Sequence, residues 1–172
     1  MTEKTVIIIP ARYASKRFEG KPLARLVGST GVGRSLIQRS WDTACAVPGV
    51  DNIFVATDDE RIAQAVWNFG GQVIMTSDTC RNGTERVAEA LQGLPTRADV
   101  VVNLQGDAPL TPPWFITRLI EEMKRDHEIQ MATPVLECDG HTLNMFLEDR
   151  RNGKVGGTTA VFDNNWDALY FS

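Results

Sequence analysis

The chain has 172 residues and a mass of 19.0 kDa, about the size of one domain. Hydrophobic residues make up 42% and charged residues 23%, which excludes disordered, collagen-like and disulfide-scaffold proteins. A net charge of −4 argues against a nucleic-acid-binding protein, and no apolar run reaches the ~18 residues of a membrane span. The N-terminus does not resemble a secretory signal, and the three widely spaced cysteines form no CxxC pair. We therefore expect a cytoplasmic protein with reduced thiols and no membrane insertion.

Short apolar runs alternate with segments of helical periodicity. The runs at residues 5–9, 52–56, 72–75 and 99–104 are rich in β-branched residues on successive positions, which is typical of strands buried on both faces. Amphipathic helices are predicted between and after them, over residues 37–45, 62–69, 87–94 and 115–123. This order, with a further strand expected at residues 130–136, predicts an α/β fold with a mostly parallel sheet.

Polar residues at the helix boundaries predict caps. Asp58 is expected to cap the second helix, and Thr111 the fourth, with Pro112 at its first position. Asn82 followed by Glu85 resembles a capping box for the third helix.

The pattern is weaker in the last third of the chain. Residues 143–147 predict a helical turn, and residues 158–163 and 168–171 predict two strands around a turn. The chain stops directly after an apolar run, so we expect a C-terminally truncated domain.

The connector after the first predicted strand, residues 10–25, is strongly basic. It sets five basic residues against the single acidic residue Glu19: Arg12, Lys16, Arg17, Lys21 and Arg25. Ligands of open α/β sheets bind beyond the carboxyl ends of the strands, where this connector must lie. The pattern favours a polyphosphate site over the alternative of a solvated basic loop. The P-loop and dinucleotide-binding glycine patterns are absent, so a nucleotide site of another type is predicted.

Asp107 follows the fourth predicted strand in the run NLQGD. A carboxylate beside a triphosphate site suits Mg²⁺, although Asp107 could instead cap the turn before Thr111. Residues 75–86 follow the third predicted strand and offer donors and acceptors for a base or for sugar hydroxyls. By composition alone that segment could also be an ordinary polar loop.

These segments resemble the 3-deoxy-D-manno-octulosonate (Kdo) cytidylyltransferases, also called CMP-Kdo synthetases. The similar runs are IIIPARYASKRFEGKPL at 7–23, VATDDERIA at 55–63, GGQVIMT at 70–76, NGTERVAEA at 82–90, VVNLQGDAPL at 101–110 and ALYFS at 168–172. The resemblance implies a three-layer Rossmann-like nucleotidyltransferase fold over residues 1–172. It also implies the reaction of CTP with Kdo to give CMP-Kdo and pyrophosphate, for lipopolysaccharide or capsule assembly.

The resemblance also implies residue roles. Arg12 and Lys21 would be catalytic, Gln105 would lie near the sugar, and Asp107 would bind Mg²⁺. The implied nucleotide-binding residues are Pro10, Ala11, Arg12, Lys21, Thr76, Arg81, Gly83 and Thr84. The implied partners are CTP and a Kdo-like sugar acid, with a homodimer formed by the full family chain, which continues beyond ALYFS.

Two other functions compete with this one. The chain could be a non-catalytic or truncated nucleotide-binding or interaction module of the same fold. A glycosyltransferase would share the architecture and bind sugar nucleotides, but no clear DxD metal motif lies near the fourth predicted strand.

Overall fold

The computed structural model describes residues 3–14, 18–94, 97–154 and 157–171, and every structural statement below concerns these residues. The chain divides into two compact units, Met1–Ala132 (unit 1) and Thr133–Ser172 (unit 2). That residues 1–172 form one truncated nucleotidyltransferase domain stays a prediction.

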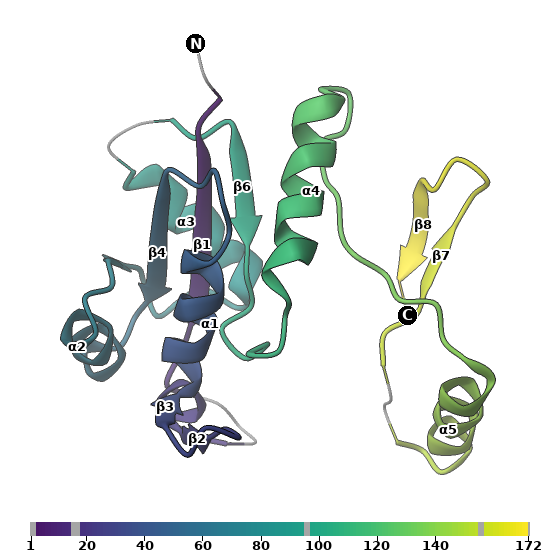
Figure 1. The fold of residues 1–172 in the computed structure, drawn as a ribbon, viewed down its shortest axis with the longest axis horizontal. Coiled ribbons are helices and arrows are strands. Elements are labelled where there is room, and N and C mark those ends of the chain that lie inside the picture. The colour runs from purple at the N-terminus through teal and green to yellow at the C-terminus, as the bar shows by residue number, and fades with distance from the viewer. Residues whose placement is uncertain (1–2, 15–17, 95–96, 155–156, 172) are drawn as a thin grey trace. The chain divides into compact units, whose positions relative to one another are not determined.

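Unit 1 is built on a parallel four-stranded sheet in the order β5-β4-β1-β6 (Figure 1). The strands are β1 (Thr5–Ala11), β4 (Asn52–Thr57), β5 (Val73–Met75) and β6 (Val100–Asn103). Ile8 in β1 pairs with Phe54 on one side and with Asn103 on the other. All four lie where the apolar runs predicted strands, and their parallel pairing confirms the α/β fold.

Helices cover both faces of this sheet, which gives three layers (Figure 1). The helices are α1 (Leu36–Cys45), α2 (Glu60–Asn68), α3 (Gly83–Gln92) and α4 (Pro113–Arg125). Side chains alternate along β1: Ile7 and Ile9 pack in the core with α1, α2 and α4, whereas Val6 and Ile8 pack in the core with α3. The whole of β1 is therefore buried, as a central strand of a covered sheet must be.

The helix caps differ in part from the predicted ones. Asn82 caps α3 as expected, since its Oδ1 accepts the Glu85 backbone N–H at 2.9 Å. The predicted cap Asp58 is wrong: Asp59 accepts the Arg61 backbone N–H at 2.9 Å and caps α2. Thr111 is also wrong as a cap, because Pro112 occupies that position and α4 begins one residue later than expected.

The segment between β1 and α1, which begins with the basic connector, contains structure that the sequence did not predict. Lys21–Leu23 form the short 3₁₀ helix η1, and β2 (Arg25–Val27) pairs antiparallel with β3 (Gly33–Ser35). The Leu36 backbone N–H donates to the Ala24 carbonyl at 2.9 Å, which joins this hairpin to the start of α1. The described part of this segment thus contains a 3₁₀ helix and a hairpin and ends at the start of α1. Lys16 and Arg17 of the basic connector lie outside the described residues.

Unit 2 contains α5 (Gly140–Arg151) and the antiparallel hairpin of β7 (Ala160–Phe162) and β8 (Ala168–Phe171). Both strands were predicted, and the predicted helical turn proves to be the middle of the longer α5. Among the described residues, no helix is long and apolar enough to cross a membrane.

The strand predicted at residues 130–136 is wrong, because this segment has no regular structure. Met131 and Leu136 are 84% and 75% exposed, and no described strand pairs with the segment. The apolar residues of this segment therefore resemble a strand in sequence, but no described strand lies beside them to form backbone hydrogen bonds.

Candidate active site

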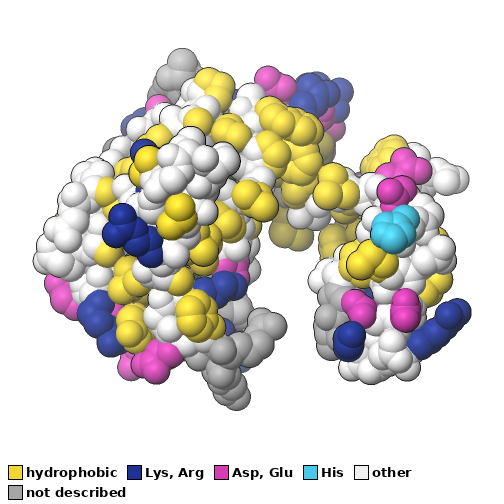
Figure 2. Space-filling model, turned by 60° about the horizontal axis from the view of Figure 1, so that its bottom comes forward, with side chains coloured by type: hydrophobic (Ala, Val, Ile, Leu, Met, Phe, Trp, Pro, Cys, Tyr) yellow, Lys and Arg dark blue, Asp and Glu magenta, His cyan; other side chains and the backbone are white. Residues whose placement is uncertain are grey.

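A cavity of about 500 Å³ lies beyond the carboxyl ends of β1 and β6. The strand order reverses between these two strands, which is where open α/β sheets bind ligands. Figure 2 shows unit 1 from that end, with Lys and Arg side chains among hydrophobic ones. Eight of the predicted site residues line the cavity: Pro10, Ala11, Arg12, Lys21, Arg81, Gly83, Gln105 and Asp107. Thr76 and Thr84 are not among the lining residues.

Lys21 and Asp107 meet in this cavity as an ion pair. The Lys21 Nζ lies 2.7 Å from the Asp107 Oδ2, and the two side chains are 42% and 54% exposed. Lys21 is the first residue of η1, and Asp107 lies in the turn that follows β6. Because both groups are open to solvent, their mutual attraction is weak and a bound ligand can replace it.

Glycines let three segments approach one another around the cavity. A Cβ at Gly106 would lie 2.8 Å from the Pro10 carbonyl oxygen, so the turn after β6 can pass this close to β1 only with glycine there. The buried Ser40 hydroxyl in α1 donates to the Gly106 carbonyl at 3.1 Å and supports this turn. A Cβ at Gly83 would lie 3.2 Å from the Pro10 Cγ and 3.3 Å from the Gln105 Oε1. The start of α3 therefore packs directly against both strand ends.

Arg81 stands at the start of α3, where the helix dipole favours anions. Its Nη2 lies 2.7 Å from the Glu85 Oε1, and its backbone N–H donates to the Glu85 Oε2 at 2.9 Å. These bonds from Arg81 lower the pKa of Glu85. The Arg81 side chain is 84% exposed, so it remains accessible to a ligand at the rim of the cavity.

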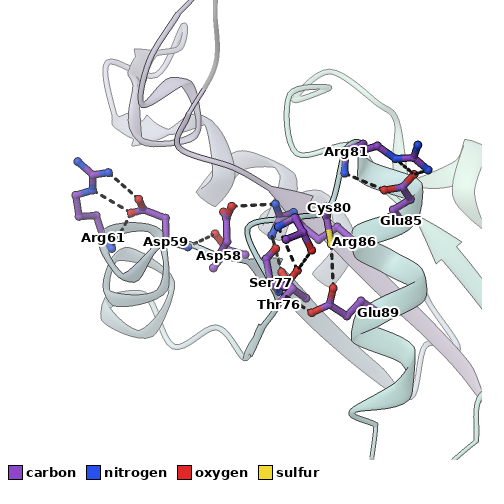
Figure 3. A network of polar contacts seen from close by, with 12 residues as sticks. Asp58, Asp59, Arg61, Thr76, Ser77, Cys80, Arg81, Glu85, Arg86 and Glu89 are labelled. Carbon is purple, nitrogen blue, oxygen red and sulfur yellow. Dashed lines mark hydrogen bonds and ion pairs between the residues drawn. The ribbon is translucent and has the colours of Figure 1, made fainter.

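Arg86 is a cavity residue that the sequence analysis missed. Its side chain is 3% exposed, and its Nη2 lies 3.1 Å from the Asp58 Oδ2 (Figure 3). Its Nη1 donates to the Thr76 hydroxyl and, at 3.4 Å, to the Ser77 carbonyl. Arg86 lies four residues before the buried Ala90 and so shares its helix face, but this spacing alone does not show the partners that bury an arginine.

Glu89 holds the segment between β5 and α3 from a second point. It accepts the Ser77 backbone N–H at 2.6 Å and the Cys80 thiol at 3.1 Å (Figure 3). The bond from Cys80 lowers the pKa of Glu89, and the same bond raises the pKa of the Cys80 thiol. The Cys80 thiol, which lines the cavity, is therefore neutral. Arg86 and Glu89 together hold the segment between β5 and α3 against α3.

Asp107 is the candidate metal ligand of the site. Within the described part of the chain, no group of three or more His, Cys, Asp or Glu side chains is placed to hold a metal. Mg²⁺ is commonly bound by one or two carboxylates together with substrate phosphates. The exposed Asp107 carboxylate fits that mode, in which a nucleotide supplies the remaining ligands.

Sequence comparison shows which proteins the chain is similar to. A family model described as cytidylyltransferase matches residues 6–172. The chain is 49% identical over 165 residues to the 3-deoxy-manno-octulosonate cytidylyltransferase of Maricaulis maris, covering 96% of this chain and 62% of that relative. It is 41% identical over 172 residues to the enzyme of the same name from Chlamydia trachomatis serovar L2, covering 100% of this chain and 63% of the relative. The chain thus spans less than two thirds of the length of these relatives.

Solved structures agree with the sequence comparison. CMP:2-keto-3-deoxy-manno-octonic acid synthetase complexed with CTP is similar with a TM-score of 0.78 and 36% identity, over 99% of this chain and 64% of that chain. A cytidylyltransferase from Leptospira borgpetersenii shares the fold with a TM-score of 0.61 at 20% identity, over 73% of this chain and 50% of that chain. With a family model that matches nearly every residue, this chain belongs to the cytidylyltransferase family.

Proposed function

We propose that this chain carries the nucleotide site of an enzyme that transfers CMP from CTP to the anomeric hydroxyl of Kdo or a related sugar acid. The observation that carries the proposal is the cavity in which Arg12, Lys21 and Asp107 come together. The names of the relatives support CTP and Kdo as the substrates.

In this proposal the basic connector binds the triphosphate. Arg12 and Lys21 donate charge-assisted hydrogen bonds to phosphate oxygens, and Lys21 exchanges the Asp107 carboxylate for phosphate on binding. Asp107 would hold Mg²⁺, which supplies neutralisation of phosphate charge when it is bound. The anomeric oxygen would form a bond to the α-phosphorus as its hydroxyl proton passes to solvent, and the bond to the pyrophosphate leaving group would break. Such a transfer depends on alignment and charge neutralisation, which these side chains can provide.

The remaining predicted residues divide by position. Pro10, Ala11, Gly83 and Arg81 would contact the nucleotide directly, because they line the cavity. Thr76 would act through Arg86, to which it is hydrogen-bonded, and Thr84 would contribute from the first turn of α3. Gln105, held by a 2.9 Å bond from its Nε2 to the Asn103 Oδ1, would lie near the sugar acid.

The setting of the reaction is also part of the proposal. CMP-Kdo would be made in the cytoplasm for lipopolysaccharide or capsule assembly, and the full family chain would act as a homodimer. The family resemblance supports these points.

The test is pyrophosphate release from CTP, Mg²⁺ and Kdo. It should use the 172-residue chain and, in parallel, the protein with any residues that follow Ser172 in its gene. We expect release with CTP in preference to UTP or ATP. Absence of release with every sugar acid tested would contradict the catalytic proposal. CTP binding without turnover would support the nucleotide-binding module, and binding of sugar nucleotides but not CTP would support a glycosyltransferase.

A further inference from the structure

The ring of Tyr13, a residue within the basic connector, lies between Arg61 of α2 and Gly20. Tyr13 is half-buried and packs against the main core of unit 1. The Arg61 Cζ lies 3.3 Å from the centroid of the Tyr13 ring, a cation–π contact. Arg61 is itself held by Asp59, with Nε–Oδ1 and Nη2–Oδ2 distances of 3.0 and 2.7 Å (Figure 3). A cap residue of α2 thereby fixes the guanidinium that covers the ring.

Tyr13 also contacts Gly20, the residue directly before Lys21. The Gly20 backbone N–H donates to the Tyr13 carbonyl oxygen at 2.9 Å. A Cβ at Gly20 would lie 3.0–3.1 Å from the Cε2, Cζ and Oη atoms of the Tyr13 ring. Gly20 has φ +67° and is the N-cap of η1, so its left-handed conformation sets where Lys21 begins the helix.

We propose that Tyr13 and Arg61 are positioning residues for Lys21. The Asp59–Arg61 pair holds the Tyr13 ring, the ring and carbonyl hold Gly20, and Gly20 directs Lys21 into the cavity. A lysine side chain is flexible, so a fixed backbone lowers the entropy lost when its ammonium binds an anion. This inference deepens the proposed function, since its CTP-binding test rests on a triphosphate being the ligand of Lys21.

The first test compares Tyr13→Ala with Tyr13→Phe, which keeps the ring. Calorimetry with CTP and Mg²⁺ should show about tenfold weaker binding for Tyr13→Ala. This loss is expected if the connector of the variant adopts its binding-competent conformation in about one tenth of the molecules. Cytidine, which lacks phosphates, should bind within about twofold of wild type, and Tyr13→Phe should bind both ligands like wild type. Equal CTP affinity in Tyr13→Ala and wild type would overturn the inference.

Arg61 provides a second variant that is safe for folding, because its side chain is 59% exposed. Arg61→Ala should weaken CTP binding in the same direction as Tyr13→Ala. The matched control is Arg118→Ala, which removes the same charge from a 68% exposed arginine paired with Glu121 and Glu122 on α4. Arg118→Ala should leave CTP affinity unchanged, and equal losses in the two variants would show a general effect of charge and overturn the role of Arg61.

A double-mutant cycle separates positioning from general damage. If Tyr13 acts through Lys21, then Tyr13→Ala should weaken CTP binding no further once Lys21→Ala is present. A full additional loss in the double variant would mean that Tyr13 acts by another route.

Amide hydrogen exchange gives a readout that needs no ligand. The backbone N–H groups of Gly20, Leu23 and Ala24 donate to the carbonyls of Tyr13, Gly20 and Lys21. In Tyr13→Ala they should exchange about tenfold faster, while amides of β1 keep their protection. Unchanged exchange would overturn the inference whatever CTP does. If wild type does not bind CTP but these amides exchange faster in Tyr13→Ala, the proposed function is overturned and the positioning of Lys21 by Tyr13 is supported.

Discussion

The Lys21 Nζ lies 2.7 Å from the Asp107 Oδ2, although the two residues are 86 positions apart in the chain. One follows β1 and the other follows β6, so the reversal of strand order between these strands is what brings them together. In the absence of a ligand, the Lys21 ammonium and the Asp107 carboxylate neutralise each other's charge. A triphosphate would draw the ammonium to its oxygens and leave the carboxylate for a cation.

Lys21→Ala should weaken CTP binding about 10- to 100-fold, because a hydrogen bond to a charged group contributes about 1.5–3 kcal/mol. Cytidine affinity should stay within about twofold, since Lys21 is proposed to contact phosphates alone. Unfolding free energy should fall by less than about 1 kcal/mol, because the Lys21–Asp107 pair is largely exposed. Calorimetry with both ligands checks this, and an equal loss for CTP and cytidine would refute a phosphate-specific role.

Asp107→Asn should remove the stimulation of CTP binding by Mg²⁺. In EDTA its affinity for CTP should equal or exceed that of wild type, because a negative charge near the triphosphate has gone. Calorimetry with Mg²⁺ and with EDTA gives both values. Asp126→Asn is the matched control, since Asp126 is exposed at the end of α4. A wild-type response to Mg²⁺ in Asp107→Asn would exclude Asp107 as the ligand.

The sheet of unit 1 could be predicted because its strands are buried on both faces. A strand in that position must be apolar at successive residues, as in residues 6–9, and this pattern is visible in the sequence alone. The positions of Arg12, Lys21 and Asp107 around one cavity followed from topology, since loops after parallel strands share one edge of the sheet. Their placement required no knowledge of side-chain packing.

Features that depend on tertiary partners could not be predicted. The hairpin of β2 and β3 is short and mostly exposed, so it lacks an apolar signature. Residues 130–136 carry a strand-like pattern, but no described strand bonds to them. An arginine on an amphipathic helix normally faces solvent. The burial of Arg86 depends on tertiary partners, the Asp58 carboxylate with Thr76 and Ser77, which the helical pattern does not show.

Asp58→Asn should lower the unfolding free energy by about 3 kcal/mol, because it leaves the Arg86 charge buried without a carboxylate. Urea unfolding measures this. The neighbouring Asp59→Asn is the matched control: asparagine also caps helices, and Arg61 is exposed, so its loss should stay below about 1 kcal/mol. Equal losses in the two variants would contradict a structural role for the Asp58–Arg86 pair.

The pH dependence of stability should report on Glu89. Its pKa lies below the ordinary value of 4.5, mainly because Cys80 donates to it. A carboxyl with a lowered folded pKa stabilises the fold fully above pH 4.5, and this stabilisation is lost as the pH falls through the folded pKa. Wild type should therefore exceed Glu89→Gln in stability above that pH, and the difference should shrink on acidification. Urea unfolding across this range checks it, and a difference that is constant or grows in acid would refute the assignment.

Cys80→Ala tests the cause of that shift. Removing the thiol donor should raise the pKa of Glu89 toward its ordinary value, as followed by carboxyl NMR titration. An unchanged Glu89 titration in Cys80→Ala would assign the shift to the Ser77 backbone N–H instead.

The claim that the basic connector and Asp107 bind one triphosphate is tested most directly by an NMR titration of the ¹⁵N-labelled protein with CTP and Mg²⁺. The amide resonances of Arg12, Lys21 and Asp107 should all shift and fit a single Kd. Shifts at Arg12 and Lys21 with none at Asp107, or shifts that follow different Kd values, would contradict it.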